Sequence, residues 1–236
     1  MRTSLLRLAF CLALILLSHP AGAAISPPKM TTLPGASVQL DPTRKTISRI
    51  EGKNLLQSLP SLAARVQRDP AAVAIEFVQA HRELFRLRQP ARELKLKAVQ
   101  ADELGFRHVR LTQTFRGLEV IQSELIFHFN RENALYLING SYLATPANVQ
   151  TRPSLSAAAA ARAVAVELKA KTANSPAVLK IWPSPGGFGV LAYEVAASVG
   201  PDQAWQVFVD AHTGKILDRI STIHTTSGLP FRRGEE

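Results

Sequence analysis

The sequence predicts an α+β fold of two small domains, each with a helix packed on an antiparallel β-sheet. Helical and alternating apolar patterns occur twice in the same order, a helix followed by several strands, on either side of a polar, proline-containing stretch at residues 145–153. Short turns separate consecutive strands, which is typical of antiparallel pairing. A chain of 236 residues is long enough for one or two domains.

The first 23 residues have the pattern of a secretory signal peptide. Arg2 and Arg7 precede a short apolar run, and small residues end at Ala23, the predicted signal cleavage position. The run is too short for an ordinary transmembrane helix, and no later segment is long enough. We therefore expect a secreted or periplasmic protein without a transmembrane anchor. The single cysteine, Cys11, lies in this run, so a mature chain would contain no disulfide.

The first domain is expected over residues 53–146, after a proline-containing linker at residues 24–52. Its helix begins with Asp69 as N-cap and Pro70 at the first helical position. His81 lies on the apolar face of this helix, where a hydrogen-bonded core position is favoured. Four alternating stretches follow, and the third places these residues on one face: Ile121, Ser123, Leu125, Phe127 and Phe129.

The second domain is expected over residues 152–222, followed by a C-terminal tail at residues 223–236. Ser156 is the predicted N-cap of an alanine-rich helix, and four alternating stretches come after it. In the last turn, Gly214 is expected to supply a positive φ.

The charge is uneven along the chain. Residues 44–116 contain fifteen Lys and Arg against seven Asp and Glu, whereas residues 117–236 contain ten of each. A solvated basic face explains this imbalance, and the alternative is a surface that steers an acidic partner. Nucleic acid is disfavoured as a partner because aromatic and basic residues do not alternate in the manner of stacking surfaces.

The usual catalytic motifs are missing. The chain contains no H-E-x-x-H zinc motif, no G-x-S-x-G nucleophile turn and no glycine-rich phosphate loop. His108 and His128 lie on neighbouring predicted strands and could share a face, but they lack a third metal ligand. We therefore expect no catalytic residue, no metal site, no cofactor and no enzymatic activity.

Gln113 is the least expected residue of the first domain. It falls in register with Val109, Leu111 and Phe115, which should face a core. A buried amide without partners costs free energy. We expect it to bond turn backbone near Gly117, and the alternative is a contact with another chain.

Two stretches resemble known families. "HVRLTQTFRGLEVIQSELIFHFN" and "LYLINGSYL" resemble the propeptide domain of fungalysin and thermolysin-like metallopeptidases. The second half resembles a PepSY domain, which has a cystatin-like fold, in its helix, paired strands and turn. The family-signature positions are Gln113, Phe115, Gly117, Asn139 and Gly140 in the first half, and Trp205, Asp210, Thr213 and Gly214 in the second.

The resemblance implies a role beside a peptidase. Such domains precede a zinc peptidase domain, assist its folding and hold it inactive until cleavage. Ile223, His224 and Thr225 resemble the junction that leads into the enzyme. Because the sequence ends at Glu236 without a peptidase domain, the resemblance transfers no zinc ligand and no catalytic glutamate.

The leading hypothesis is an exported protein that binds, inhibits or assists the folding of a thermolysin-like metallopeptidase in trans. The alternatives are a PepSY-type binding module for another envelope ligand, and a truncated remnant of a metallopeptidase zymogen. The target peptidase and the oligomeric state are open at this point.

Overall fold

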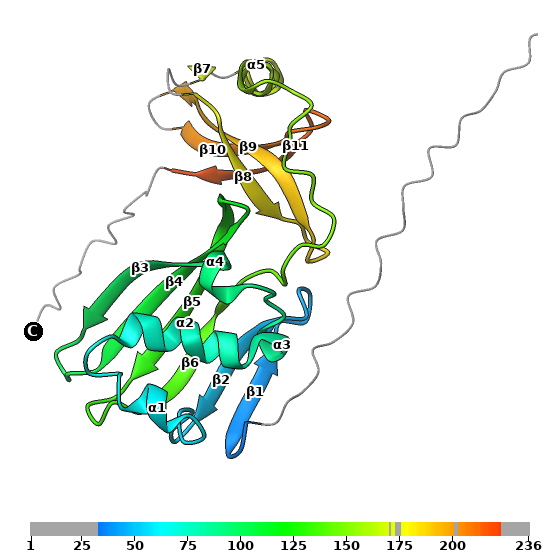
Figure 1. Cartoon of the computed structure of the whole chain (residues 1–236). Helices are drawn as coiled ribbons and strands as arrows, with labels where there is room; N and C mark the ends of the chain where they lie inside the picture. The colour runs from blue at the N-terminus through cyan, green and yellow to red at the C-terminus, as the bar shows by residue number, and fades with distance from the viewer. Residues whose placement is uncertain (1–32, 170, 173–175, 201–202, 223–236) are drawn as a thin grey trace, which may run out of the picture.

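The protein has two stacked lobes that share one long strand (Figure 1). The computed structural model describes residues 33–169, 171–172, 176–200 and 203–222. The first lobe contains strands β1–β6 and helices α1–α4, and the second contains helix α5 and strands β7–β11. Helices and mostly antiparallel strands confirm the predicted α+β class.

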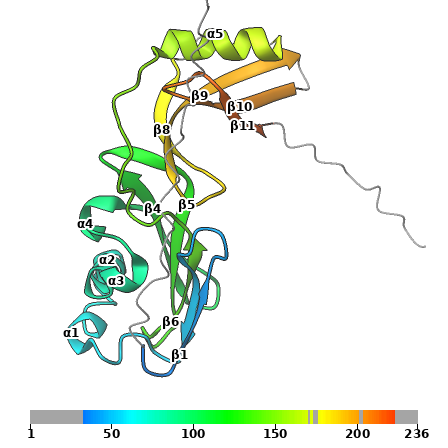
Figure 2. The same cartoon turned by 90° about the vertical axis from the view of Figure 1, so that its right-hand side faces the viewer.

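The first lobe is a sheet with helices on one face only, as Figure 2 shows. The strand order is β1-β2-β6-β5-β4-β3, and every pairing is antiparallel. The strands are β1 (Ala36–Leu40), β2 (Ile47–Gly52), β3 (Leu94–Ala101), β4 (Arg107–Phe115), β5 (Leu118–Phe129) and β6 (Leu135–Ser141). The helices are α1 (Pro60–Ala63), α2 (Pro70–Ala80), α3 (Arg82–Phe85) and α4 (Pro90–Glu93).

The prediction of a linker over residues 24–52 is wrong for its described part. Strands β1 and β2 belong to the first sheet, with β2 paired to β6. Ile47 and Ile50 are fully buried in the first core. The prolines that suggested a linker lie mainly before β1, so the sparse apolar residues of residues 36–52 were underrated as strand formers. Residues 24–32 lie outside the described residues.

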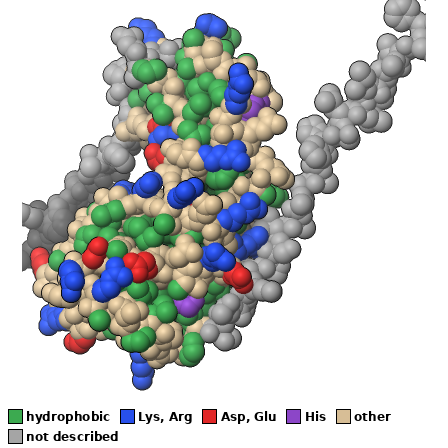
Figure 3. Space-filling model, in the orientation of Figure 1, with side chains coloured by type: hydrophobic (Ala, Val, Ile, Leu, Met, Phe, Trp, Pro, Cys, Tyr) green, Lys and Arg blue, Asp and Glu red, His purple; other side chains and the backbone are tan. Residues whose placement is uncertain are grey.

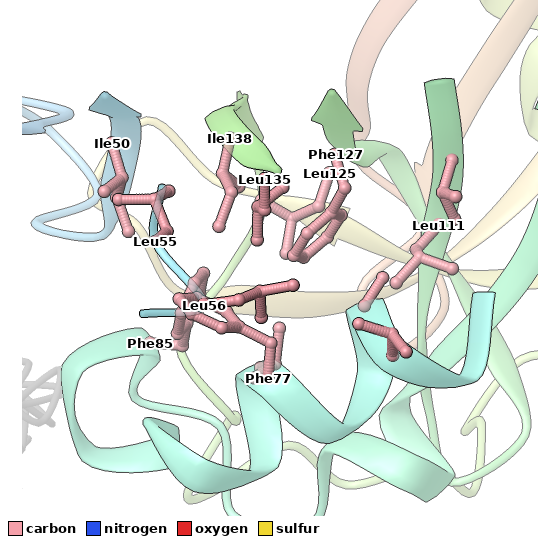
Figure 4. Close-up of a cluster of buried hydrophobic side chains, with 14 of the residues drawn as sticks. Ile50, Leu55, Leu56, Phe77, Phe85, Leu111, Leu125, Phe127, Leu135 and Ile138 are labelled. Carbon is pink, nitrogen blue, oxygen red and sulfur yellow. The ribbon is translucent and has the colours of Figure 1, made fainter. Parts of the chain in front are cut away.

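The core of the first lobe lies between the helices and the sheet (Figure 4). Asp69 accepts a hydrogen bond from Ala72 N (2.9 Å), which confirms the predicted N-cap of α2. Phe77 points from this helix toward Phe127 and Leu125 of β5. Burying each such side chain contributes about 1.5–3 kcal/mol, so this aromatic layer dominates the stability of the lobe.

His81, the C-cap residue of α2, lacks part of the hydrogen bonding that we expected. Its ring packs on Phe77, with ring centroids 4.6 Å apart, but its buried Nε2 has no hydrogen-bond partner. The predicted hydrogen-bonded core position is therefore wrong for this nitrogen. Burial lowers the pKa of His81 because the charged imidazolium loses hydration.

The second lobe places helix α5 (Ala157–Leu168) on a smaller sheet. The strands are β7 (Lys171–Thr172), β8 (Val178–Pro183), β9 (Gly189–Gly200), β10 (Gln203–Asp210) and β11 (Ile216–Ser221). They pair antiparallel in the order β8-β9-β10-β11, and β7 also pairs with β9. Ser156 accepts a hydrogen bond from Ala159 N (3.2 Å), as predicted for the N-cap.

One parallel contact joins the two sheets. Val120 of β5 pairs with Ile181 of β8, so β5 runs from the second lobe into the first. The sequence predicted antiparallel pairing throughout, because its local turns connect only consecutive strands. The domain boundary near residues 145–153 stays a prediction, and the shared strand shows that the lobes are not separate sheets.

Candidate binding site at the junction of the two lobes

A bulge divides β5 into two parts that serve different lobes. Gln122 has a positive φ of 51°, and the pairing with β4 changes register between Thr112 and Thr114. Ser123 and the alternate residues after it face the first lobe. Ile121 packs instead against Trp182 and other residues of the second lobe. The prediction that Ile121 shares a face with Ser123 is therefore wrong. Between two paired positions β5 has four residues where β4 has one, and an odd number of extra residues reverses the alternation.

Gln113 lies opposite this bulge and is 1% exposed. Its Nε2 donates to Leu143 O (2.8 Å), and its Oε1 accepts from Leu143 N (2.9 Å) and from Ser123 Oγ (3.1 Å). The side chain thus pairs with the backbone beyond β6 as a neighbouring strand would. The prediction of a bond to turn backbone near Gly117 is wrong, since the amide bonds a segment thirty residues away.

Gly140 and Asn139 lie on β6 beside the second part of β5. Gly140 has φ 152°, and a Cβ at this position would lie 2.0 Å from Glu124 O. Only a residue without a side chain permits this approach of the two strands. Asn139 Oδ1 lies 2.7 Å from His128 Nε2.

The tip of the β4–β5 hairpin enters the second lobe. Arg116 and Gly117 form a two-residue turn with φ 50° and 84°, as type I′ hairpin turns require. The turn expected near Gly117 is therefore confirmed. Phe115, just before the turn, is 6% exposed and packs in the core of the second lobe. The Arg116 guanidinium lies 5.2 Å from the centre of the Phe115 ring.

A pocket of about 370 Å³ lies beside this tip. We call it the junction pocket. Its walls come from α4 and the residues before it, from the hairpin tip and from the connection between the lobes: Arg88, Gln89, Arg92, Glu93, Phe115, Arg116, Gly117, Thr145, Pro146 and Ala147. Segments distant in the chain therefore form one site.

Hydrogen bonds hold the pocket walls together. Glu93 is 6% exposed and accepts from Gln89 N (2.7 Å) and Thr145 Oγ1 (2.6 Å). Thr145 Oγ1 also accepts from Arg88 N (2.8 Å), and Thr145 N donates to Arg86 O (2.9 Å). The connection is thereby anchored to the first lobe at Thr145.

Five arginines line the junction pocket and two adjoining hollows. We call Arg82, Arg86, Arg88, Arg92 and Arg116 the arginine cluster. Within the described residues, no member forms an ion pair, whereas Arg65 and Arg110 bind Glu76 and Glu124. Basic side chains gather at the waist between the lobes in Figure 3. An unpaired cationic surface beside a pocket is chemically suited to an anionic group.

A second charged group crosses the junction. Lys180 Nζ of β8 lies 2.5 Å from Glu194 Oε2 of β9 and 3.1 Å from Glu119 Oε2 of β5. Burial opposes the charged form of Lys180, but the bonds to the two glutamates outweigh it and raise the pKa of this lysine. These contacts tie the parallel strand pair together.

His108 and His128 share a face of the sheet, as predicted. Their Nδ1 atoms lie 2.8 Å apart, and His108 Nε2 lies 3.2 Å from Asp102 Oδ2. Burial, followed by nearby cationic groups, lowers the pKa of His128, although its bond to Asn139 opposes the shift. Among the described residues, no group of three or more His, Cys, Asp or Glu side chains could hold a metal ion.

The other predicted site residues do not reach the junction pocket. Trp205 lies on β10, with the Arg219 guanidinium 5.6 Å from its ring centre. Asp210 Oδ1 accepts from His212 N and from Thr213 N in the turn before β11, where Gly214 has the predicted positive φ of 77°. Ala23 and Ile223, His224 and Thr225 lie outside the described residues.

Sequence reasoning missed the arginine cluster as a site. Four of its members lie within eleven residues, from Arg82 to Arg92, and this local density was a usable signal. The charge count treated the whole of residues 44–116 as basic and did not locate the excess. The pocket itself needs the hairpin tip and the connection, which no local pattern brings together.

Comparisons with known proteins show that part of the first lobe is similar to peptidase propeptides. Residues 92–142, from α4 through β6 to Tyr142, match the Fungalysin/Thermolysin Propeptide Motif. Bacillolysin of Bacillus amyloliquefaciens is 29% identical over 208 residues, covering 81% of this chain and 38% of bacillolysin. Thermolysin of Alicyclobacillus acidocaldarius is 30% identical over 163 residues, covering 64% and 30%. The chain thus spans 38% of the length of this bacillolysin and 30% of the length of this thermolysin.

One solved structure has a distant likeness to the chain. The Bacillus megaterium YpeB C-terminal domain has a TM-score of 0.38 and 12% identity, over 80% of this chain and 83% of that one, and this likeness supports no functional conclusion. In the described part of the chain, no helix has the length and apolar character to cross a membrane. The chain therefore carries a propeptide motif of the fungalysin and thermolysin type and is similar in sequence to thermolysin-like metallopeptidases.

Proposed function

We propose that this protein is an exported propeptide-like module that binds a thermolysin-like zinc metallopeptidase supplied as a separate chain, inhibits it and assists its folding. The observation that carries the proposal is the propeptide motif at residues 92–142. These residues form α4, β3, β4, β5 and β6, which include the shared strand and its hairpin tip. The similarity to bacillolysin extends over 81% of the chain and so beyond the first lobe.

The physical argument concerns surface and folding rate. Enzymes rich in non-local contacts fold slowly because distant segments must meet before contacts stabilise them. A folded partner that offers a large complementary surface can hold such segments together, and stable interfaces typically bury about 1,200–2,000 Å². The same bound surface blocks substrate if it lies over the cleft. The segment Ile223–Thr225, by its resemblance to a propeptide junction, is the proposed part nearest the cleft.

The test uses residues 24–236 and the catalytic domain of bacillolysin from Bacillus amyloliquefaciens. We expect residual peptidase activity to fall, and refolding yield of the denatured enzyme to rise, as the protein is added in increasing amounts. The protein alone should cleave no substrate. The matched variant lacks residues 223–236 and should inhibit less while melting at nearly the same temperature. If neither activity nor refolding yield changes across several thermolysin-like enzymes, the proposal fails.

A second candidate function is an exported binding module for another anionic ligand of the envelope. The observation that favours it is the arginine cluster, whose charges are unpaired within the described residues. A pull-down from the native host, followed by mass spectrometry, separates the two. Recovery of a metallopeptidase supports the first function, and recovery of a different acidic component without a peptidase supports the second.

A further inference from the structure

We propose that the junction pocket recognises an acidic side chain of the partner polypeptide, presented beside an apolar residue. The identity of the partner rests on the proposed function, whereas the chemistry of the ligand rests on the pocket. The occupant is a protein segment that carries a carboxylate, and it would contact the hairpin tip, α4 and the connection at once.

The first argument is charge. Arg88 lines the junction pocket and both adjoining hollows, and Arg92 lines two of the three. Both side chains are exposed, and neither is held by an ion pair with a described residue. Arginine binds carboxylates through two parallel N–H donors, so guanidinium groups at a pocket rim favour a carboxylate ligand.

The second argument is that the nearby carboxylate does not neutralise the arginines. Glu93 also lines the pocket, but its oxygens accept from Gln89 N and Thr145 Oγ1. The acceptor capacity of this carboxylate is directed at the pocket framework. The guanidinium groups of Arg88 and Arg92 therefore remain available for a ligand.

The third argument is rigidity. The backbone N of Arg88 donates to Thr145 Oγ1, and the next element begins at the buried Pro90. The base of each arginine is therefore fixed although its guanidinium is exposed. A fixed base lowers the entropy lost on binding, which separates a recognition site from a flexible solvated face.

The fourth argument distinguishes an acidic side chain from a free phosphate. Phe115, Pro146 and Ala147 form an apolar part of the same pocket. A phosphate ion has no group to cover these carbons. A peptide with an acidic and an apolar side chain fits both parts of the wall.

The test is a titration of ¹⁵N-labelled residues 24–236 followed through the arginine Nε–H signals. The probes are the blocked dipeptide acetyl-Glu-Phe-amide, its neutral analogue acetyl-Gln-Phe-amide, and inorganic phosphate. We expect saturable shifts at Arg88 and Arg92 with the Glu dipeptide, at least about five-fold tighter than with the Gln dipeptide, because two exposed ion pairs contribute about that factor. Equal affinity for the two dipeptides, or tighter binding of phosphate, would overturn the proposal.

The variant pair separates a specific site from overall charge. Arg88→Glu with Arg92→Glu reverses two charges at the pocket, and Arg68→Glu with Arg162→Glu reverses two exposed charges on other surfaces. Because the first pair lacks the Arg88 and Arg92 signals, the titration of both pairs is followed through the Arg116 Nε–H and the Thr145 backbone amide, which also line the pocket. The first pair should abolish the saturable shifts of these signals and the second should keep them. An equal loss in both pairs would overturn the proposal.

A milder change keeps the test valid if the double reversal unfolds. Arg88→Gln removes one charge and should weaken the Glu dipeptide about two- to three-fold, while Arg88→Lys should recover part of the loss. Unchanged binding by Arg88→Gln would overturn the proposal.

Binding to the bacillolysin catalytic domain distinguishes this inference from the proposed function. Suppose that the enzyme binds, and that Arg88→Glu with Arg92→Glu weakens binding at least five-fold more than the control pair does. The proposed function and the pocket assignment then both hold. If the enzyme binds and the two reversals are equivalent, the pocket assignment fails and the proposed function stands. If the enzyme does not bind but the Glu dipeptide does, the proposed function fails and the pocket assignment stands.

Discussion

The core of the first lobe is built from residues of that lobe, whereas the core of the second lobe includes residues from the strands of the first. In the first lobe, Phe77, Phe85, Phe127 and Phe129 are fully buried among residues of the same lobe. The buried cluster of the second lobe includes Phe115 and others from the first lobe's strands. The comparison teaches that the hairpin tip is a structural part of the second lobe, although the chain order assigns it to the first.

The helices of the two lobes also differ in how much apolar side chain they bury, and α2 of the first lobe buries more. Helix α2 buries Val73, Phe77 and Val78, whereas the only buried residues of α5 are Ala160 and Val164. Each buried methylene contributes about 0.8 kcal/mol to the free energy of unfolding. Because the buried side chains of α5 are small, the packing of this helix on its sheet contributes little stability. The second lobe therefore depends more on contacts from outside its own residues.

The largest expected effect comes from separating the lobes. Residues 33–147 should fold alone because they keep the whole first core. Residues 148–222 should remain unfolded because they lose Phe115, Val120 and the pairing of β8 with β5. Far-UV circular dichroism and thermal melting of both fragments check this. A cooperative melting transition in residues 148–222 alone would show that the second lobe is independent.

The next effect concerns the strand contact at the junction. Gly140→Ala should destabilise the protein by about 3 kcal/mol or more, because severe steric and backbone changes give losses of this size and the new Cβ would lie 2.0 Å from Glu124 O. Gly117→Ala is the matched control. It has positive φ but no atom within 4 Å of the new Cβ, and it should cost about 1–2 kcal/mol. Urea unfolding of both variants measures the difference, and equal losses would contradict the steric argument.

A third change tests whether the hairpin tip belongs to the second lobe. Phe115→Ala should cost about 3 kcal/mol, because its ring is buried in the second core. Hydrogen exchange should show lost protection in β9 and β10 and unchanged protection in β2. Phe127→Ala, in the first core, should destabilise β2 and β6 directly. The comparison of lobes fails if Phe115→Ala exposes β2 as strongly as β10.

Gln113→Leu should have a somewhat smaller effect of about 2 kcal/mol, because it leaves buried backbone groups of Leu143 without partners. The smaller change Ser123→Ala removes only one donor to Gln113 and should cost about 1 kcal/mol. Chemical unfolding measures both. If Gln113→Leu is neutral, the amide does not hold the segment after β6 in place.

The smallest expected effect is a dependence of stability on pH, caused mainly by His128 in the first lobe. The folded-state pKa of His128 lies below its ordinary value of 6.5, mainly because burial disfavours the charged ring. Between the folded and unfolded pKa values, the unfolded state binds more protons, so stability falls as the pH drops below about 6.5. Thermal melting between pH 8 and pH 5 checks the sign.

The control for this pH dependence is His128→Gln. This variant should flatten the decrease, although the lowered pKa of His81 leaves a remainder of the same sign. Hydrogen exchange at pH 5.5 should first show weaker protection in β4, β5 and β6, next to His128. A melting temperature that rises on acidification through this range would contradict the assignment.

The local features of the fold were determined by the sequence itself. The N-caps Asp69 and Ser156 and the turns at Gly117 and Gly214 all followed from patterns within a few residues. These features depend on side-chain bonds to adjacent backbone and on allowed φ values. Neighbouring residues decide both, so a single sequence is enough to predict them.

Only the tertiary structure decided how distant segments meet. It placed β1 and β2 in the first sheet and paired β5 with β8. It also brought the Gln113 amide into hydrogen bonds with the backbone of Leu143. It also joined the arginine cluster, the hairpin tip and the connection at Thr145 into one pocket. The bulge at Gln122 illustrates the reason. The extra residues of β5 redirect every side chain that follows, and whether the bulge forms depends on the strands packed on either side of β5.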